Sequence, residues 1–167
     1  MLSQFIGNVR RNHALEHATV SLLIAKLGPD LRLVGRATGD GFFIYGDIPT
    51  NTLTDCANEG LARLKRGEAF WAVTPLCGTN LATAGILAGL SSIATMGTGN
   101  RRDRLPSVMM AGILAVIVAQ PLGRIVQRHI TTSPDLADTE IVAIDVRRGG
   151  AIHKVRTRRA PVLAFAT

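Results

Sequence analysis

Two histidines and a glutamate lie close together near the start of the sequence. His13, Glu16 and His17 are spaced i, i+3 and i+4, which places three side chains on one face of a helix. Both imidazoles can then reach a single ion, and histidine nitrogen is a common zinc ligand. The spacing therefore predicts a metal site with His13 and His17 as ligands. The alternative is a histidine–carboxylate hydrogen-bond cluster that fixes helix packing.

The helix that carries these residues is expected to run from about Asn8 to Leu27. Asn8 is a plausible N-cap, and Gly28-Pro29 is a strong helix stop. The face that holds the three ionisable side chains continues with valine, isoleucine and leucine. An isolated charge on such a face is costly unless it is paired, neutralised or bound to metal. This apolar setting makes the cluster the most informative feature of the sequence.

The run His13-Ala-Leu-Glu16-His17 matches the pattern H-x-x-E-H. In this it resembles the motif of the inverzincin metallopeptidases. The resemblance implies that the two histidines bind zinc and that Glu16 is the general base that activates a bound water. It extends over five residues of the chain.

Cys77 and His129 form a second candidate pair. Cys77 opens a long apolar run and His129 follows another, so an antiparallel helix pair would make them neighbours. A thiolate is favoured at a helix N-terminus and beside a histidine. The pair could act as nucleophile and base, or supply further ligands to His13 and His17, as could His153. In the alternative, Cys77 is inert at a helix cap and His129 lies among lipid headgroups.

The two apolar runs predict a transmembrane hairpin. Residues 69–100 and 105–123 contain no charged side chain, and a bilayer core needs roughly 20 mostly apolar residues in a helix. The first helix is expected to begin near Gly78, and the second to run from Pro106 to about Arg124. The alternative is a soluble protein with two buried core helices.

The flanks of the hairpin must lie on one side of the membrane and can fold together. Residues 31–38 and 42–46 predict one β-hairpin and residues 140–146 and 151–157 another, which can join in a four-stranded sheet. Residues 50–66 predict an amphipathic helix with a capping box at Thr52 and Asp55. The expected fold is an α+β membrane protein. Residues 69–124 form the hairpin, and residues 1–68 and 125–167 together form one soluble α+β domain. The tail from Arg156 onward is expected to be peripheral.

Charge and cysteine content narrow the setting. The net charge is +7, from 19 Lys and Arg against 12 Asp and Glu. The few aromatic residues are not interleaved with the charges, so nucleic acid is not an expected partner. Basic residues beside apolar helices fit cytoplasmic flanks and anionic headgroups. Two cysteines and no apparent signal peptide agree with an inner-membrane protein whose flanks lie in the cytoplasm.

Several short runs together resemble an uncharacterised family of small bacterial membrane proteins. They are 11–19, 39–42, Cys77-Gly-Thr-Asn80, 120–123 and 127–132, and they span most of the chain. The resemblance implies a membrane location and no known activity.

Two functions are expected from these features. The first is a membrane-anchored metal-binding protein, in its most concrete form a zinc-dependent hydrolase or peptidase, with metal ligands His13, His17 and His129 and catalytic residues Glu16 and Cys77. The second is a non-catalytic accessory or assembly subunit. Small residues at 85, 89, 111, 112, 115 and 119 would then pack a homodimer or a partner membrane helix.

Overall fold

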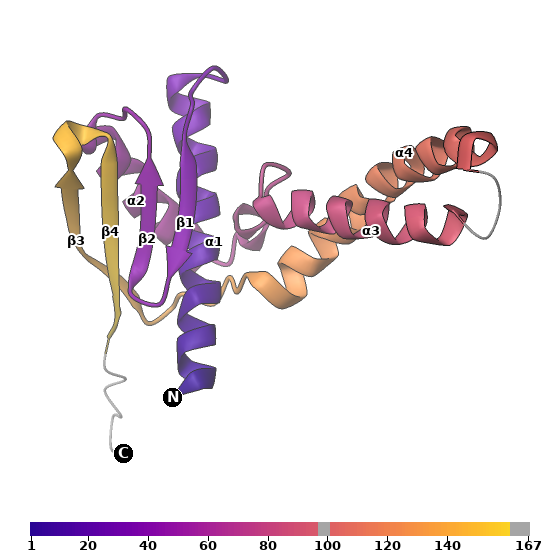
Figure 1. Cartoon of the computed structure of the whole chain (residues 1–167). Helices are drawn as coiled ribbons and strands as arrows, with labels where there is room; N and C mark the ends of the chain where they lie inside the picture. Colours follow the sequence, from indigo (N-terminus) through magenta and orange to yellow (C-terminus); the bar gives the residue numbers. More distant parts are fainter. Residues whose placement is uncertain (97–100, 161–167) are drawn as a thin grey trace, which may run out of the picture. The chain divides into compact units, whose positions relative to one another are not determined.

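The computed structural model describes residues 1–96 and 101–160, and it divides into two compact units. The first unit combines Met1–Val73 with the chain from Thr131 onward, and the second is Thr74–Ile130. Helices and an antiparallel four-stranded sheet occur together (Figure 1), so the expected α+β class is confirmed.

The first helix, α1 (Leu2–Leu27), is longer than the sequence predicted. It begins six residues before Asn8, so the expected cap lies inside the helix. The stop at Gly28 is confirmed, because this residue has a φ of 101°, a conformation that glycine adopts at little cost. The middle of α1 is buried nearly all round, with Leu15, Ala18 and Leu23 fully inaccessible.

Both predicted hairpins are present. Their strands are β1 (Val34–Thr38) and β2 (Gly41–Tyr45), then β3 (Thr139–Arg147) and β4 (Ile152–Arg159). The order in the sheet is β1-β2-β4-β3, so β4 pairs with both β2 and β3 and joins the two hairpins. The predicted peripheral tail is wrong from 156 to 159, which belong to β4. The rest of that tail, from 161, lies outside the described residues.

The second helix, α2 (Thr50–Lys65), also falls where the sequence placed it. Its predicted capping box is absent, because the N-cap is Pro49 and no side chain caps the helix. A 3-10 turn follows at Ala69–Ala72. Figure 1 shows α1 and α2 on the same face of the sheet. The core between them contains large buried side chains from both helices and two strands: Leu15, Leu23, Phe42, Ile44, Leu53, Leu61, Leu64 and Val155.

The second unit is a pair of packed helices, α3 (Gly78–Met96) and α4 (Arg101–Val126). α3 begins at the residue expected. α4 begins before Pro106, which lies inside the helix together with Pro121, and a π-helical turn at Gln127–Thr131 follows. Polar side chains connect the start of α3 to the residues after α4. Gln127 accepts a hydrogen bond from the Thr74 amide at 3.0 Å and donates one to Asn80 Oδ1 at 2.7 Å.

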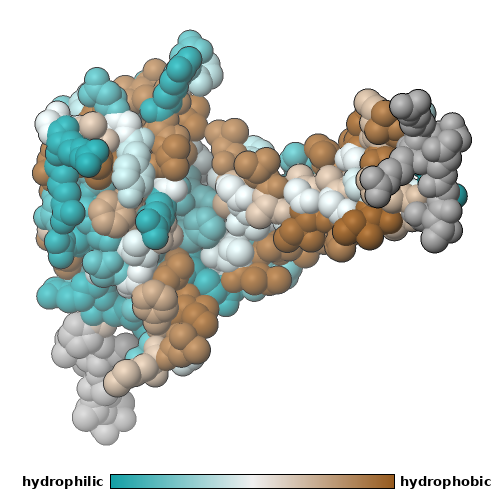
Figure 2. Space-filling view, in the orientation of Figure 1, coloured by the Kyte–Doolittle hydropathy of each residue, from teal (hydrophilic) through white to brown (hydrophobic). Residues whose placement is uncertain are grey.

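One helix in the described part of the chain is long and apolar enough to cross a membrane. It covers Arg104–Thr131. The sequence predicted two such spans, but α3 does not qualify, since serine, threonine and asparagine side chains interrupt its apolar run. Large apolar side chains are nevertheless exposed along both helices (Figure 2), among them Leu81, Ile86, Leu90, Ile93, Met109, Ile113, Ile117 and Ile125.

Candidate metal centre

The histidine–glutamate cluster lies in the buried middle of α1. Glu16 and His17 are 7% and 2% exposed, and His13 is half-buried. The imidazole rings of His13 and His17 are edge to face, with centroids 4.3 Å apart. The helical spacing read from the sequence therefore brings all three side chains together.

His17 has one ring nitrogen engaged and the other without a partner. Its Nδ1 lies 2.8 Å from the backbone oxygen of Ala72, at the end of the 3-10 turn. A carbonyl only accepts, so Nδ1 carries the proton and Nε2 is left with a lone pair. Nε2 is buried and has no hydrogen-bond partner among the described residues. A buried basic nitrogen without a donor is costly, and it has the electronic form that binds a metal ion.

The Nδ1 atom of His13 is also engaged by a backbone carbonyl. This atom lies 3.0 Å from the backbone oxygen of Thr131, where the chain returns to the first unit. The opposite nitrogen, Nε2, lies 3.8 Å from Glu16 Oε2, and His17 Nε2 lies 4.0 Å from the same oxygen. Metal-binding histidines commonly donate their other ring N–H to a backbone carbonyl, which fixes the tautomer and the orientation of the ring.

Glu16 is held in this position by a close approach to the sheet. A Cβ atom built on Gly35 of β1 would lie 1.8 Å from Glu16 Oε1, so only glycine leaves room for the carboxyl group. Burial raises the pKa of Glu16 to about 7, and the charge of His13 opposes this shift. The carboxyl group is thus buried beside the two Nε2 atoms.

The donor atoms fit a small transition-metal ion. The nitrogens of His13 and His17 that could bind an ion lie within 4.8 Å of each other. Ligands of a tetrahedral zinc ion with bonds of roughly 2.0–2.1 Å are about 3.3 Å apart, so small side-chain adjustments bring both nitrogens onto one ion. The orphaned Nε2 of His17 and the soft or borderline donors available agree with such an ion.

Cys77 and His129 belong to the second unit. Cys77 is a buried free thiol immediately before α3; its Sγ lies 3.3 Å from Thr79 Oγ1 and accepts from the Thr79 amide at 3.4 Å. The sulfur therefore caps the helix. His129 lies in the π-helical turn after α4 and is exposed. The catalytic and ligand roles predicted for these two residues stay predictions.

His153 lies elsewhere in the first unit. It is fully buried on β4, opposite Ile44 and Val146, and its Nε2 is 3.0 Å from Thr50 Oγ1 at the start of α2. Burial lowers its pKa. The expectation that His153 faces the core is confirmed.

Sequence reasoning missed the parts of the site that support the histidines. These are the carbonyls of Ala72 and Thr131 and the glycine that makes room for Glu16. Backbone carbonyls carry no residue-type signature. Gly35 does give a hint, because a glycine inside an alternating strand often marks a close approach.

Comparison with known proteins supports one family. Residues 8–144 match the family described as a domain of unknown function, DUF6391. An uncharacterised protein of Picosynechococcus sp. is 32% identical over 168 residues, which cover 90% of this chain and 79% of that protein. No solved structure matches the chain. The expected resemblance to an uncharacterised family is thereby confirmed, and the matched region contains the whole histidine–glutamate cluster.

Proposed function

This chain belongs to the DUF6391 family, and we propose that it is a membrane-anchored metal-binding protein with His13 and His17 as ligands. One observation carries the proposal: the buried Nε2 of His17 has no hydrogen-bond partner among the described residues, while its Nδ1 is fixed by a carbonyl. His153 also has a buried ring nitrogen without a described partner, Nδ1, but His17 has in addition a second imidazole, that of His13, beside its ring.

Zinc is the ion that the donor types favour. Imidazole nitrogen is one of its usual ligands, and both His13 and His17 offer it. When bound, zinc supplies Lewis-acid polarisation and an activated water, which is the chemistry of a hydrolase. Glu16 is the residue placed to accept a proton beside the two ligand nitrogens, 3.8 and 4.0 Å away. We therefore assign it the role of general base in a zinc-dependent hydrolase.

Membrane anchoring is proposed for both helices of the second unit. α4 has the length and apolarity of a span. In α3, the hydroxyl groups that reduce its hydropathy donate to carbonyls of their own helix, as in Thr83 to Thr79 and Ser92 to Ala88, at 2.8 and 2.7 Å. Polar groups that are satisfied within the helix are tolerated in a bilayer. The predicted two-span hairpin, with its flanks in the cytoplasm, is thus retained as part of the proposal.

An accessory or assembly subunit is the second candidate function. Gly85 and Gly89 of α3 and Gly112 of α4 have open space where a Cβ would be, among the described residues. Small residues exposed on apolar helices allow close approach of another membrane helix or a second copy. In this reading the histidine cluster only stabilises α1.

Metal analysis of purified full-length protein tests the proposal. We expect about one equivalent of zinc by inductively coupled plasma mass spectrometry, lost in His17→Asn and retained in the matched control His153→Asn, because one ion is held by the α1 pair. A titration with zinc in competition with a chelator measures the zinc affinity directly, so that zinc lost during purification does not affect the result. Wild-type protein that neither contains nor binds metal would exclude the metal centre and favour the accessory role.

The same measurement assigns the other residues. Cys77→Ala compared with Cys56→Ala shows whether the thiol at α3 is a ligand, since Cys56 is buried in α2 and lies outside the cluster. If the Glu16→Gln variant keeps its zinc, the result agrees with the role of general base. If the variant loses its zinc, Glu16 is a metal ligand. The base role then requires that Glu16→Gln abolish any hydrolysis found for the wild type.

A further inference from the structure

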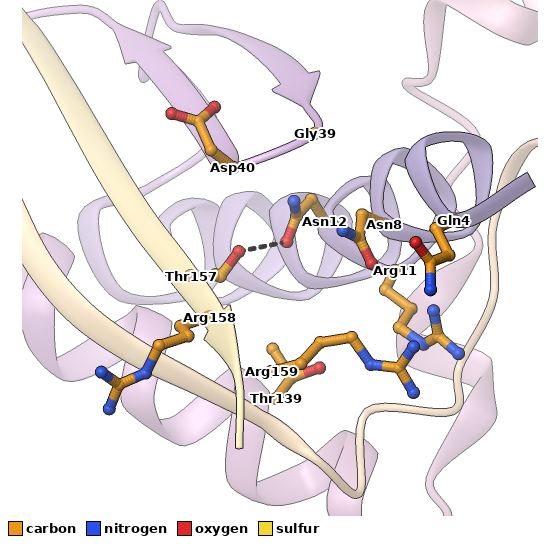
Figure 3. A pocket seen from close by; sticks show the side chains of 10 residues that line it. All are labelled: Gln4, Asn8, Arg11, Asn12, Gly39, Asp40, Thr139, Thr157, Arg158 and Arg159. Carbon is orange, nitrogen blue, oxygen red and sulfur yellow. Dashed lines mark hydrogen bonds between the residues drawn. The ribbon is translucent and has the colours of Figure 1, made fainter. Parts of the chain in front are cut away.

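A polar pocket of about 370 Å³ lies in the first unit, among the first half of α1, the β1–β2 turn and the ends of β3 and β4 (Figure 3). None of the metal-centre residues lines it. Its polar wall includes three arginines, two amide side chains and a hydroxyl: Arg11, Arg158, Arg159, Gln4, Asn8 and Thr139. The composition is that of a site for an anion.

Two of the guanidinium groups gather on one side of this pocket. Arg159 donates to Asp138, and Arg11 donates to the backbone oxygen of Asp135 at 2.9 Å. The hydrogen bond from Arg159, with further help from the charge of Arg11, holds the pKa of the Asp138 carboxyl below its usual value. Figure 3 shows the two guanidiniums near the side chain of Gln4. Arg11 also forms an ion pair with Asp135 at 3.8 Å, so each of these two arginines has a carboxylate partner, while both guanidinium-bearing residues still line the pocket.

Thr139 gives the second, independent indication of a ligand. It is 3% exposed and lines the pocket, and its Oγ1 has no hydrogen-bond partner among the described residues. Buried hydroxyl groups are normally satisfied, so an unpartnered one at a pocket wall indicates a missing acceptor. The neighbouring wall is already fixed, because Asn12 donates to Thr38 O at 2.8 Å and accepts from Thr157 at 2.6 Å.

We propose that this pocket binds a phosphate ester, with its anionic group between Arg11 and Arg159 and within reach of the Thr139 hydroxyl. Arginine forks match the geometry of phosphate oxygens, and a hydroxyl donor completes the set. The volume exceeds that of phosphate alone, so an organic group attached to the phosphate fits as well. Asp40 also lines the pocket, and its carboxylate is paired with the ammonium group of Lys154 at 2.7 Å.

The ester is either a lipid headgroup or a soluble metabolite. The first turns of α1 expose Leu2, Phe5 and Ile6. Phe5 lies against Gly39 of the pocket wall, where an added Cβ would be 2.6 Å from its ring. An apolar rim beside a phosphate site suits both the chain of a phospholipid and the apolar part of a small ester.

Isothermal titration calorimetry tests the site. The full-length protein in a non-ionic detergent is titrated with two probes, inorganic phosphate and glycerol 3-phosphate. Both should bind, glycerol 3-phosphate more tightly. Thr139→Val loses only a hydroxyl without a described partner, so the fold should be kept while the Kd rises about tenfold. Arg159→Gln should raise the Kd at least as much as Thr139→Val does. The control Arg156→Gln, on the same strand and paired with Asp145, should leave it unchanged.

Mixed micelles distinguish the two sources. If added phosphatidylglycerol competes with glycerol 3-phosphate, the pocket takes a lipid headgroup; if it does not, the ligand is soluble. Wild-type protein that binds neither probe nor phosphatidylglycerol overturns the proposal. A Thr139→Val variant that binds the probes with wild-type affinity also overturns the proposal. An Arg156→Gln control whose affinity falls as much as that of Arg159→Gln does the same. Zinc content does not enter these readouts, so this result is independent of the metal centre.

Discussion

Gly35 is the residue on which the position of Glu16 depends. Substitution by alanine would place a methyl group 1.8 Å from Glu16 Oε1, which forces the carboxyl group away from the histidines. We expect Gly35→Ala to lower the free energy of unfolding by roughly 1–3 kcal/mol, as overpacking typically does, and to weaken zinc binding. Urea denaturation and zinc titration measure the two effects. Gly7→Ala is the control, because there a Cβ meets only the end of the flexible Arg11 side chain.

His153 should make stability depend on pH. Burial lowers the pKa of His153 below the ordinary histidine value of 6.5, so the unfolded chain takes up a proton more readily than the folded one. The free energy of unfolding should therefore fall as the pH drops below about 6.5, by an amount set by the difference between the two pKa values. Urea unfolding at pH 7.5 and 5.5 measures it. His153→Leu should show a smaller decrease than wild type; an equal decrease would assign the effect to other groups.

At the residue scale, the sequence predicted the cluster well and its surroundings poorly. His13, Glu16 and His17 come together because helical spacing alone fixes their common face. Their partners Ala72 and Thr131 are distant in sequence and contribute only backbone oxygens. No residue type encodes such a contact.

Among the elements, the helix pair of the second unit depends on one close approach. A Cβ on Gly123 of α4 would lie 2.1 Å from Asn80 Oδ1 and 3.2 Å from Asn80 Cα, so α3 and α4 touch there. Gly123→Ala should separate them and break the hydrogen bond between Asn80 and Gln127. We expect a loss of roughly 1–3 kcal/mol, seen as a lower thermal midpoint in detergent. Gly112→Ala, on the same helix with open space, should leave the midpoint unchanged or raise it.

Element positions were predicted best where local patterns determine them. The alternation of residues in both hairpins and the Gly28 stop needed no tertiary information. Helix starts were predicted less well, because α1 begins at Leu2 without a side-chain cap and α4 continues through Pro106. The strand order β1-β2-β4-β3 depends on pairing between hairpins that are far apart in the chain, and no local pattern specifies it.

For the whole molecule, the proposed membrane anchoring depends on α4, the one described helix long and apolar enough to cross a bilayer. Arginine in place of Ile117, near the middle of the apolar helix, costs roughly 2.5–3.5 kcal/mol in a bilayer. We expect Ile117→Arg to shift the protein from the carbonate-resistant membrane fraction to the soluble or aggregated fraction. Val142→Arg, an exposed position on β3, is the control and should remain in the membrane. Wild-type protein that carbonate extracts completely would contradict membrane anchoring.

The position of β4 between β2 and β3 has a consequence during synthesis of the chain. β2 is an unpaired edge on one side until β4 leaves the ribosome, and β4 is the last strand in the described part of the chain. α3 and α4 emerge earlier, between β2 and β3 in the sequence. The nascent chain therefore presents two apolar helices and an open strand edge together, a state prone to misassembly. Early capture of the helices by a membrane or a partner would leave only the sheet to complete once translation ends.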